Sequence, residues 1–274
     1  MFRSLIDQCV VSCYKELINS KEEEIQCLVK KYQKEFKREA DFILQTIVEN
    51  LVSKAILEQL SDEQLEDMIV SELENQFSNL QKFQKSVLVE VCVEGLEEEI
   101  NRVLELPMAC SIEQFACAIL GTFQCEGNHL YSVNYKDDRF VSLFEGDDPD
   151  ENIWYASYVY LTQLNLRKNS KLEIEYDYGE NYKFKIHVQA IKKHSYLFKM
   201  EDAQILDGKG FGIWEDSHIY LDLYYKDRKA FYERLEADHL EENMFPVDVN
   251  FDLDIENDAL YDYTLTVLET YKVD

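Results

Sequence analysis

The sequence predicts an α+β protein in two parts, an all-helical bundle or arm at residues 1–82 and a mixed α+β domain with a mainly antiparallel sheet at residues 83–274. Three observations lead to this prediction. Residues 1–82 contain neither glycine nor proline, and their apolar side chains recur at helical spacing. At Ser86 the apolar period changes from about 3.6 residues to about 2. Residues 171–188 then alternate in the manner of a β-hairpin. The change of period places the expected domain boundary.

Three or four helices are expected in residues 1–82. The first covers residues 2–18, and Ser20 with Glu23 makes a capping box that opens the second. A third apolar stripe continues the second helix or follows it, and Ser61 with Gln64 opens the last helix. The apolar faces of these later segments comprise Ile25, Leu28, Val29, Tyr32 and Phe36; Phe42, Ile43, Ile47, Leu51 and Ala55; and Leu65, Met68, Ile69, Leu73 and Phe77.

One basic cluster lies in the second of these helices. Its members are Lys30, Lys31, Lys34, Lys37 and Arg38. Glu35 and Glu39 interrupt the cluster at helical i, i+4 distances, a pattern typical of a solvated helix face. This interpretation is preferred to a nucleic-acid patch, because the whole chain carries a formal charge of −27.

The second part begins with strands and a capped helix. Four valines alternate with other residues over positions 87–93, and a second strand at residues 100–106 stops at Pro107. Ser111 with Gln114 caps a helix. The expected inner face of that helix comprises Ile112, Phe115, Ala116, Ile119, Leu120 and Phe123.

Further strands and two helices complete the prediction. Residues 129–135 form a strand, Asp137 and Asp138 a turn, and residues 139–144 the return strand, before an acidic loop at residues 145–151. A passage with Gly208, Gly210 and Gly212 lacks the Lys-Ser/Thr ending of a phosphate loop and the spacing of the dinucleotide motif. Helices are expected over residues 216–237 and 254–271, separated by a turn at Phe245-Pro246.

The hairpin at residues 171–188 has an apolar and a charged face. A three-residue loop, Gly179 to Asn181, keeps the tyrosines on one side, with Asn181 in a left-handed conformation. The predicted apolar pairs are Tyr178 with Tyr182, Tyr176 with Phe184, and Ile174 with Ile186. The predicted charged pairs are Asp177 with Lys183, Glu175 with Lys185, and Glu173 with His187.

Composition bounds the functional classes. The seven cysteines are odd in number and contain no CxxC pair, which favours buried reduced thiols over disulfides or a zinc ribbon. The first residues do not have the pattern of a signal peptide, and no apolar run reaches about 18 residues. A cytoplasmic protein that does not enter a membrane is expected. GxSxG and HExxH signatures do not occur, and the acidic charge favours basic partners or cations.

Six short motifs at residues 86–260 resemble the plasmid pRiA4b ORF-3-like family, whose members are often encoded on plasmids and transposons. They are INRVLELP with Arg102 and Pro107, SIEQFACAIL, His129-Leu130-Tyr131, YDYGEN, GKGFGIWED and FDLDIENDAL. The resemblance implies an α+β fold with a curved sheet and no established reaction. The family's Trp and His after the hairpin turn are Tyr182 and Phe184 here. Its Pro-Pro is Ile213-Trp214, and its Gly-Gly is His218-Ile219.

Six motif residues are candidates for a site. They are Asp177, Glu180, Glu215 and Asp216, together with His129 and His218. Converging carboxylates and an imidazole hold a hard divalent cation or divide acid and base roles, and Glu215 and Asp216 are the metal candidates. A structural alternative exists for five of them: a cross-strand partner for Asp177, a turn for Glu180, a helix start for Glu215 and Asp216, and a loop carbonyl bonded by His129.

Three functions remain open. The first is a non-enzymatic interaction module with an acidic rim that binds a protein or peptide partner through exposed tyrosines. Its candidate tyrosines are Tyr155, Tyr158, Tyr160, Tyr220, Tyr224 and Tyr225. The second is a metal-assisted hydrolase that uses the acidic motif residues. The third is a nucleic-acid-binding accessory protein that uses the basic cluster. No organic cofactor is expected, whereas a divalent cation is compatible with the second function.

Overall fold

The computed structural model describes residues 23–36, 40, 43–47, 69–75, 77, 80–145, 152–247 and 249–271. The backbone forms two compact units. The first comprises residues 1–85 with residues 193–198, and the second comprises residues 86–192 with residues 199–274. The first unit therefore includes a short segment from the second half of the chain.

The first unit contains helix α2, Glu23–Phe36, and the 3₁₀ helix η2, Gln81–Gln84. Tyr32, Phe36 and Phe77 pack against one another with ring centroids 5.1 to 5.3 Å apart, and the Tyr32 hydroxyl donates to the Leu73 carbonyl at 2.7 Å. The expected face of α2 is confirmed for its described residues, Leu28, Val29, Tyr32 and Phe36.

Several expectations for this region lie outside the described residues. They are the helix over 2–18, both capping boxes of residues 1–82, and Lys37 and Arg38 of the basic cluster. The three described lysines of that cluster, Lys30, Lys31 and Lys34, are exposed, as a solvated helix face requires.

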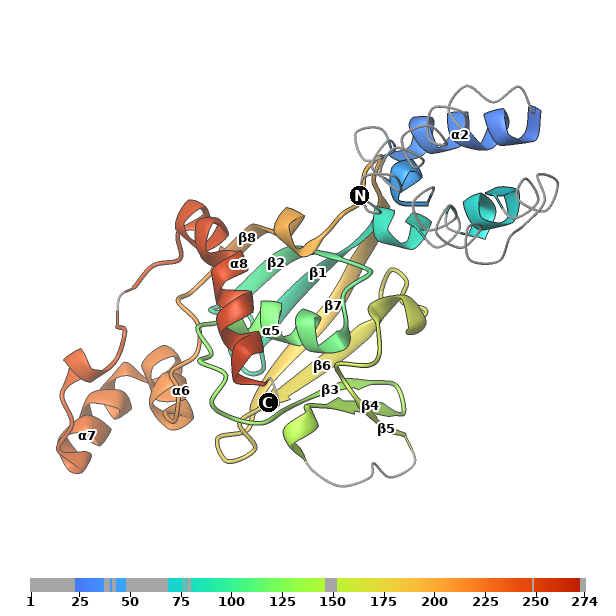
Figure 1. Ribbon diagram of the computed structural model, residues 1–274. Helices are drawn as coiled ribbons and strands as arrows, with labels where there is room; N and C mark the ends of the chain where they lie inside the picture. The colour runs from blue at the N-terminus through green and yellow to red at the C-terminus, as the bar shows by residue number, and fades with distance from the viewer. Residues whose placement is uncertain are drawn as a thin grey trace, which may run out of the picture. The chain divides into compact units, whose positions relative to one another are not determined.

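The second unit is built on an eight-stranded, mixed and mostly antiparallel sheet in the order β5-β4-β3-β6-β7-β1-β2-β8 (Figure 1). Only the β4 and β5 pair is parallel among the strand pairs with a defined register. The strands are β1 Lys85–Val93, β2 Asn101–Pro107, β3 Tyr131–Tyr135, β4 Asp138–Val141, β5 Ile153–Tyr155, β6 Lys171–Tyr176, β7 Tyr182–Lys193 and β8 Gln204–Lys209.

Helices α5, Ile112–Thr122, and α8, Leu253–Thr270, pack against each other on one face of this sheet (Figure 1). The predicted capping box of Ser111 and Gln114 is present in α5, and the predicted inner face of the helix is buried. Gly121 allows the close approach of the two helices, because a Cβ atom there would lie 2.9 Å from the Tyr263 Cβ.

The single helix predicted over residues 216–237 is wrong. The structure has two helices, α6, His218–Lys226, and α7, Arg228–Asp238. Asp227 separates them with a non-helical backbone, and its side chain accepts from the Ala230 N–H at 3.0 Å to cap α7. The remaining 3₁₀ helices are η3 Leu143–Glu145, η4 Leu161–Gln163, η5 Met200–Asp202 and η6 Glu242–Met244.

The hairpin of β6 and β7 exists, but its register is two residues from the prediction. Tyr176 faces Tyr182, Ile174 faces Phe184, and Glu175 faces Lys183. The predicted faces survive, since a shift of about two residues returns each side chain to the same side of the sheet. Tyr178 is 37% exposed and does not join the core, and Asp177 lies in the turn rather than opposite Lys183.

The turn between β3 and β4 is displaced by one residue from the prediction. Tyr135 pairs with Asp138, so Lys136 and Asp137 form the turn, and Lys136 adopts φ 57°. The strand predicted from residue 129 begins at Tyr131, which leaves His129 in the preceding loop. Strands β5 and β8 were not predicted.

A buried arginine fixes the Gly-rich passage that leads to the candidate site. Arg102 of β2 is fully buried. Its Nε donates to the Thr122 carbonyl at 3.2 Å, its Nη1 to the carbonyls of Asn101 and Lys209 at 2.8 and 2.7 Å, and its Nη2 to the Phe211 carbonyl at 2.8 Å. Burial lowers the pKa of Arg102 to about 10, and the guanidinium ties β8 and the chain after it to α5.

The start of α8 also holds β8 and the Gly-rich passage in place. Phe251 lies 4.4 Å from the Arg102 guanidinium, and Asp252 accepts from the Asp254 and Ile255 N–H groups as the cap of α8. The Asn257 amide donates to the Ile205 carbonyl and accepts from the Ile205 N–H, each at 2.8 Å. Asn257 therefore satisfies backbone groups of β8, which is the last strand of the sheet.

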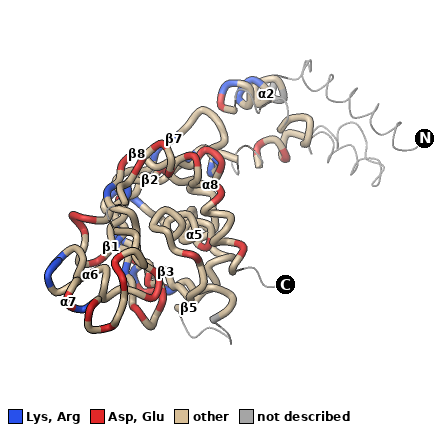
Figure 2. Tube along the Cα trace, turned by 90° about the vertical axis from the view of Figure 1, so that its left-hand side faces the viewer, with Lys and Arg blue, Asp and Glu red and all other residues tan. Residues whose placement is uncertain are grey.

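Acidic residues outnumber basic ones along the trace of the second unit (Figure 2). Within the part of the chain that the structure describes, no helix combines the length and apolar character needed to cross a lipid bilayer.

Candidate functional site

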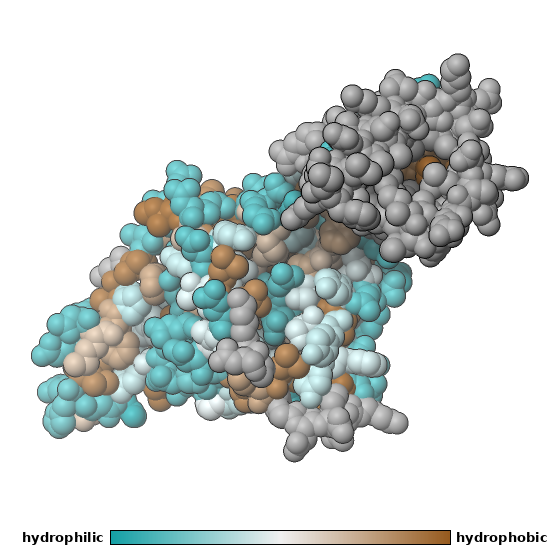
Figure 3. Space-filling model, viewed as in Figure 1, coloured by the Kyte–Doolittle hydropathy of each residue, from teal (hydrophilic) through white to brown (hydrophobic). Residues whose placement is uncertain are grey.

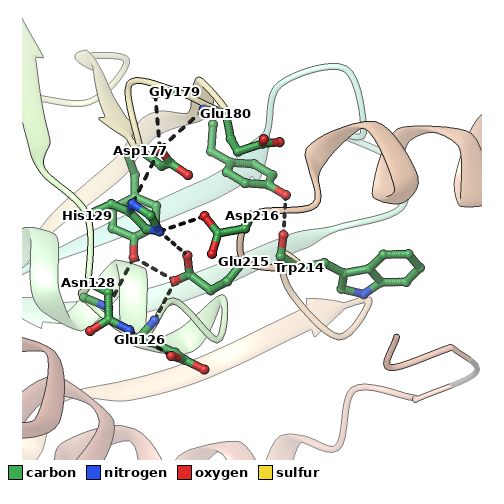
Figure 4. A network of polar contacts seen from close by, with 12 residues as sticks. Glu126, Asn128, His129, Asp177, Gly179, Glu180, Trp214, Glu215 and Asp216 are labelled. Carbon is green, nitrogen blue, oxygen red and sulfur yellow. Dashed lines mark hydrogen bonds and ion pairs between the residues drawn. The ribbon is translucent and has the colours of Figure 1, made fainter. Parts of the chain in front are cut away.

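Four of the six candidate residues form one cluster, in which three carboxylates surround the imidazole of His129 (Figure 4). The His129 Nδ1 lies 3.6 Å from Oδ1 of Asp177. Its Nε2 lies 3.4 Å from Oε2 of Glu215 and 3.3 Å from Oδ1 of Asp216. The four residues come from three segments: the loop before β3, the hairpin turn, and the chain between β8 and α6.

The hairpin turn holds Asp177 in a fixed conformation. Its Oδ1 accepts from the N–H groups of Gly179 and Glu180 at 3.1 and 3.3 Å, and its own N–H donates to the Leu130 carbonyl at 3.0 Å. Asp177 and Asn181 both have a left-handed backbone, with φ 54° and 60°, which aspartate and asparagine tolerate. The side-chain bonds of Asp177 therefore build the five-residue turn that displaced the predicted register.

Glu215 is fixed through its other oxygen. Oε1 accepts from the Tyr176 hydroxyl and from the Glu126 N–H, each at 2.7 Å. The Tyr176 oxygen in turn accepts from the Gly127 N–H at 3.2 Å. Burial, with nearby Cys125 and the bond to Glu215, raises the pKa of Tyr176 far above its ordinary value. Tyr176 thus remains a hydrogen-bond donor to the Glu215 carboxylate.

His129 is partly exposed, between the buried Asp177 and the exposed Asp216. Its side chain is 28% exposed, compared with 9% for Asp177 and 77% for Asp216. The Tyr271 hydroxyl donates to the His129 carbonyl, and the Tyr176 ring packs edge-on against the imidazole with centroids 5.7 Å apart. The predicted bond of His129 to a loop carbonyl is replaced by contacts with three carboxylates.

Two carboxylate oxygens in the cluster lack a donor. Among the described side chains, Oδ2 of Asp177 and Oε2 of Glu215 are buried without a hydrogen-bond partner. A neutral imidazole carries only one proton, so it cannot donate to carboxylates at both ring nitrogens. Ligand atoms of His129, Asp177 and Glu215 lie within 4.8 Å of one another, which is close enough for one cation to contact all three.

The other two candidates, Glu180 and His218, lie beside the cluster and bond to each other. The His218 N–H donates to Oε2 of Glu180 at 2.8 Å. The His218 ring stacks on Tyr182 with centroids 4.5 Å apart, and the Tyr182 hydroxyl donates to the Trp214 carbonyl at 2.6 Å. These contacts join the hairpin to the segment that carries Glu215 and Asp216.

Sequence reasoning missed the tyrosines of this site. Tyr176 and Tyr182 were assigned to the apolar face of the hairpin, and both rings are indeed buried. Their hydroxyls, however, reach polar partners from another segment. A tyrosine at the end of an apolar strand face is the signal that could have indicated this role, because a buried hydroxyl requires a partner.

A protein-family model described as "Plasmid pRiA4b ORF-3-like protein" matches residues 85–255. The chain belongs to the plasmid pRiA4b ORF-3-like family. The crystal structure of MM3350, a protein of unknown function from Methanosarcina mazei Go1, is also similar. Its identity to this chain is 16%, with a TM-score of 0.49, and the match covers 63% of this chain and 96% of that one. No match is found among curated proteins.

Five of the six pRiA4b ORF-3-like motifs divide into two groups in this structure. His129-Leu130-Tyr131, YDYGEN and the end of GKGFGIWED supply the cluster around His129. Arg102 and the FDLDIENDAL segment instead support β8 and α8. At the departures from the family pattern, Phe184 packs against Phe123 with ring centroids 5.0 Å apart, and His218 contacts Glu180.

Proposed function

We propose that this protein binds a divalent cation through His129, Asp177 and Glu215, and that the bound ion activates water for hydrolysis. The observation that supports this proposal is the convergence of ligand atoms of His129, Asp177 and Glu215 within 4.8 Å, where each carboxylate also keeps one buried oxygen without a hydrogen-bond partner. Buried carboxylate oxygens are costly unless they are paired or bound to a cation. A divalent cation at this point would take one oxygen from each carboxylate and a nitrogen of His129 as its three protein ligands.

The ligand types favour a particular class of ion. One imidazole with two carboxylates suits zinc and other divalent transition ions, whereas calcium and magnesium prefer oxygen ligands alone. Three protein ligands leave a coordination position for water, as catalytic zinc sites do. The exposure of the His129 and Asp216 side chains, 28% and 77%, gives solvent access to this position.

Asp216 is suited to a different role from the three ligands. Its carboxylate lies 3.3 Å from the His129 Nε2 and is largely exposed. A cation bound to three protein ligands lowers the pKa of its water, and a neighbouring carboxylate can accept the proton released. Asp216 is therefore the proposed general base, and metal-assisted hydrolysis is the proposed reaction type.

Calorimetric titration with zinc chloride and manganese chloride tests the first step. The wild type is expected to bind one of these ions at a single site, and His129→Ala is expected to lose at least about tenfold in affinity. His187→Ala is the matched control, because His187 lies on β7 outside the cluster. Equal ion binding by wild type and His129→Ala would remove the proposal. Hydrolysis of p-nitrophenyl acetate, measured with and without EDTA, tests whether the bound ion supports hydrolysis.

A protein-interaction module remains a second candidate because of exposed aromatic residues. Trp154, Tyr158 and Tyr160 are 50%, 69% and 46% exposed, and they lie near one another in sequence around β5. Of the six tyrosines that the sequence indicated, Tyr224 is instead 4% exposed and belongs to the core. A pull-down in which wild type and a Trp154→Ala/Tyr158→Ala variant retain the same proteins would count against this candidate.

A further inference from the structure

A cleft of about 400 Å³ shares one residue with the cluster around His129, since Glu215 contributes to its wall and also contacts His129. Phe211, Ile213 and Trp214 line it on the approach to Glu215, and Tyr263, Thr266 and Val267 line it from α8. The volume lies within the range of about 300 to 1,000 Å³ that small-molecule sites occupy. On the face that carries α5 and α8, hydrophobic residues form several separate groups among hydrophilic ones (Figure 3).

The charge of this cleft disfavours one class of substrate. None of the described residues that line it is lysine or arginine, whereas Glu126 and Glu215 both contribute to its wall. The Gln124 amide is directed to Glu256, at 3.4 and 3.5 Å from its two carboxylate oxygens. Sites that bind phosphoryl groups supply cationic side chains or rows of N–H groups. Away from the proposed cation, an anionic substrate would meet the carboxylates of Glu126 and Glu215 here.

We infer that the substrate is an uncharged ester or amide whose apolar group occupies this cleft. This inference rests on the proposed function, since it places the carbonyl of the substrate at the cation beside Glu215. Apolar and aromatic walls would bind a phenyl or alkyl group through burial of its surface. The substrate class is thereby narrowed to acyl compounds and away from phosphate esters.

The reaction balances with water as the only co-substrate. The oxygen of a water held at the site would form a bond to the carbonyl carbon, and Asp216 would take one of its protons. The bond from that carbon to the leaving oxygen or nitrogen then breaks, and the leaving group takes the proton from Asp216. The products are a carboxylic acid, which loses its remaining proton to solvent, and an alcohol or amine.

Hydroxamate binding to the zinc-loaded protein tests this inference without a known substrate. Benzohydroxamate and acetohydroxamate share the zinc-binding group and differ in the apolar part. Benzohydroxamate is expected to bind roughly tenfold more tightly than acetohydroxamate. Phenylphosphonate, which carries the same ring on an anionic group, is expected to bind more weakly than benzohydroxamate.

Two tryptophan variants on α8 test whether the tighter binding of benzohydroxamate depends on the cleft. Thr266→Trp narrows the cleft from an exposed position, whereas Asp258→Trp is an exposed control outside the cleft. Thr266→Trp should remove the advantage of benzohydroxamate, Asp258→Trp should keep it, and all three proteins should bind zinc equally. The inference is overturned if wild type binds zinc but binds benzohydroxamate no more tightly than acetohydroxamate. It is also overturned if Thr266→Trp keeps the tighter binding of benzohydroxamate, or if phenylphosphonate binds wild type more tightly than benzohydroxamate does. Failure of wild type to bind zinc would instead overturn the proposed function, and this inference with it.

Discussion

Glu180 and His218 are joined by two hydrogen bonds that connect the hairpin turn to the start of α6. Oε2 of Glu180 accepts from the His218 N–H at 2.8 Å, and the carbonyl of Glu180 lies 2.7 Å from the His218 Nδ1. A carbonyl can only accept, so the Nδ1 carries the proton. The pair holds together the two segments that deliver Asp177 and Glu215 to His129 (Figure 4).

Loss of this connection should weaken cation binding more than it weakens the fold. Glu180→Ala removes one charge-assisted bond, and we expect a decrease in the free energy of unfolding of about 1 kcal/mol. Zinc affinity should decrease roughly tenfold, as it does when residues that orient metal ligands are removed. Calorimetry and urea unfolding measure the two effects. The exposed Glu201→Ala serves as control, and an unchanged zinc affinity in Glu180→Ala would contradict the role.

Asp177 offers a test that separates the turn from the cation site. In Asp177→Asn the amide oxygen can still accept from the N–H groups of Gly179 and Glu180, and asparagine also adopts a left-handed backbone. We expect a free energy of unfolding within about 1 kcal/mol of wild type and the loss of zinc binding. Asp177→Ala should lose zinc binding and should also be less stable, because its side chain cannot accept the two hydrogen bonds of the turn. Zinc binding by Asp177→Asn at wild-type affinity would show that the carboxylate is not a ligand.

Two glycines should respond differently to substitution by alanine. Gly210 has φ +74°, and a Cβ atom there would lie 2.4 Å from the Glu99 carbonyl oxygen, whereas at Gly179 the nearest atom is Oδ1 of Asp177 at 3.3 Å. We expect Gly210→Ala to lower the free energy of unfolding by more than about 2 kcal/mol. Gly179→Ala should change it by less than about 1 kcal/mol. Similar denaturation midpoints for the two variants would contradict the described packing of the Gly-rich passage.

Replacement of Arg102 by another cationic residue should lower the stability of the fold. A lysine has a single ammonium group and cannot donate to all four carbonyls that the guanidinium contacts, so buried acceptors would lose their partners. Arg102→Lys is expected to lower the free energy of unfolding by about 3 kcal/mol, while the exposed Arg167→Lys changes it little. Chemical denaturation measures both variants, and equal stability would exclude the anchoring role.

Buried thiols predict a loss of stability at alkaline pH. Burial raises the pKa of Cys110 from its ordinary value of 9.0 to about 12. Between these values the unfolded state releases the proton and the folded state keeps it. The free energy of unfolding therefore decreases as the pH rises through this window. Cys110→Ala should flatten this dependence in denaturation curves at pH 8 to 11. An identical slope in wild type and Cys110→Ala would contradict the assignment.

The elements that the sequence predicts correctly are those set by local chemistry. The four valines of β1 lie on one face because a strand alternates its side chains. The box of Ser111 and Gln114 begins α5 because both partners lie within one helical turn. The buried and exposed faces of β6 and β7 are also predictable, because the observed register shift matches the two-residue period of a strand and leaves each side chain on its face.

The features that the sequence does not predict depend on contacts between distant segments. The hairpin register follows from the bonds of the Asp177 carboxylate, which alternation of apolar residues does not reveal. Strand β8 contains two charged residues and a glycine, and it is held by β2 and by Asn257. The convergence of His129, Asp177 and Glu215 arises from three separate segments. Sequence reasoning could nominate these residues but could not place them together.

An anomalous difference map from a crystal soaked in zinc or manganese chloride tests the central claim most directly. We expect a peak about 2.0 to 2.2 Å from a nitrogen of His129 and from carboxylate oxygens of Asp177 and Glu215. The same soak of Asp177→Asn should give no peak there. A wild-type map with ions only at other acidic positions, and none beside His129, would contradict the claim.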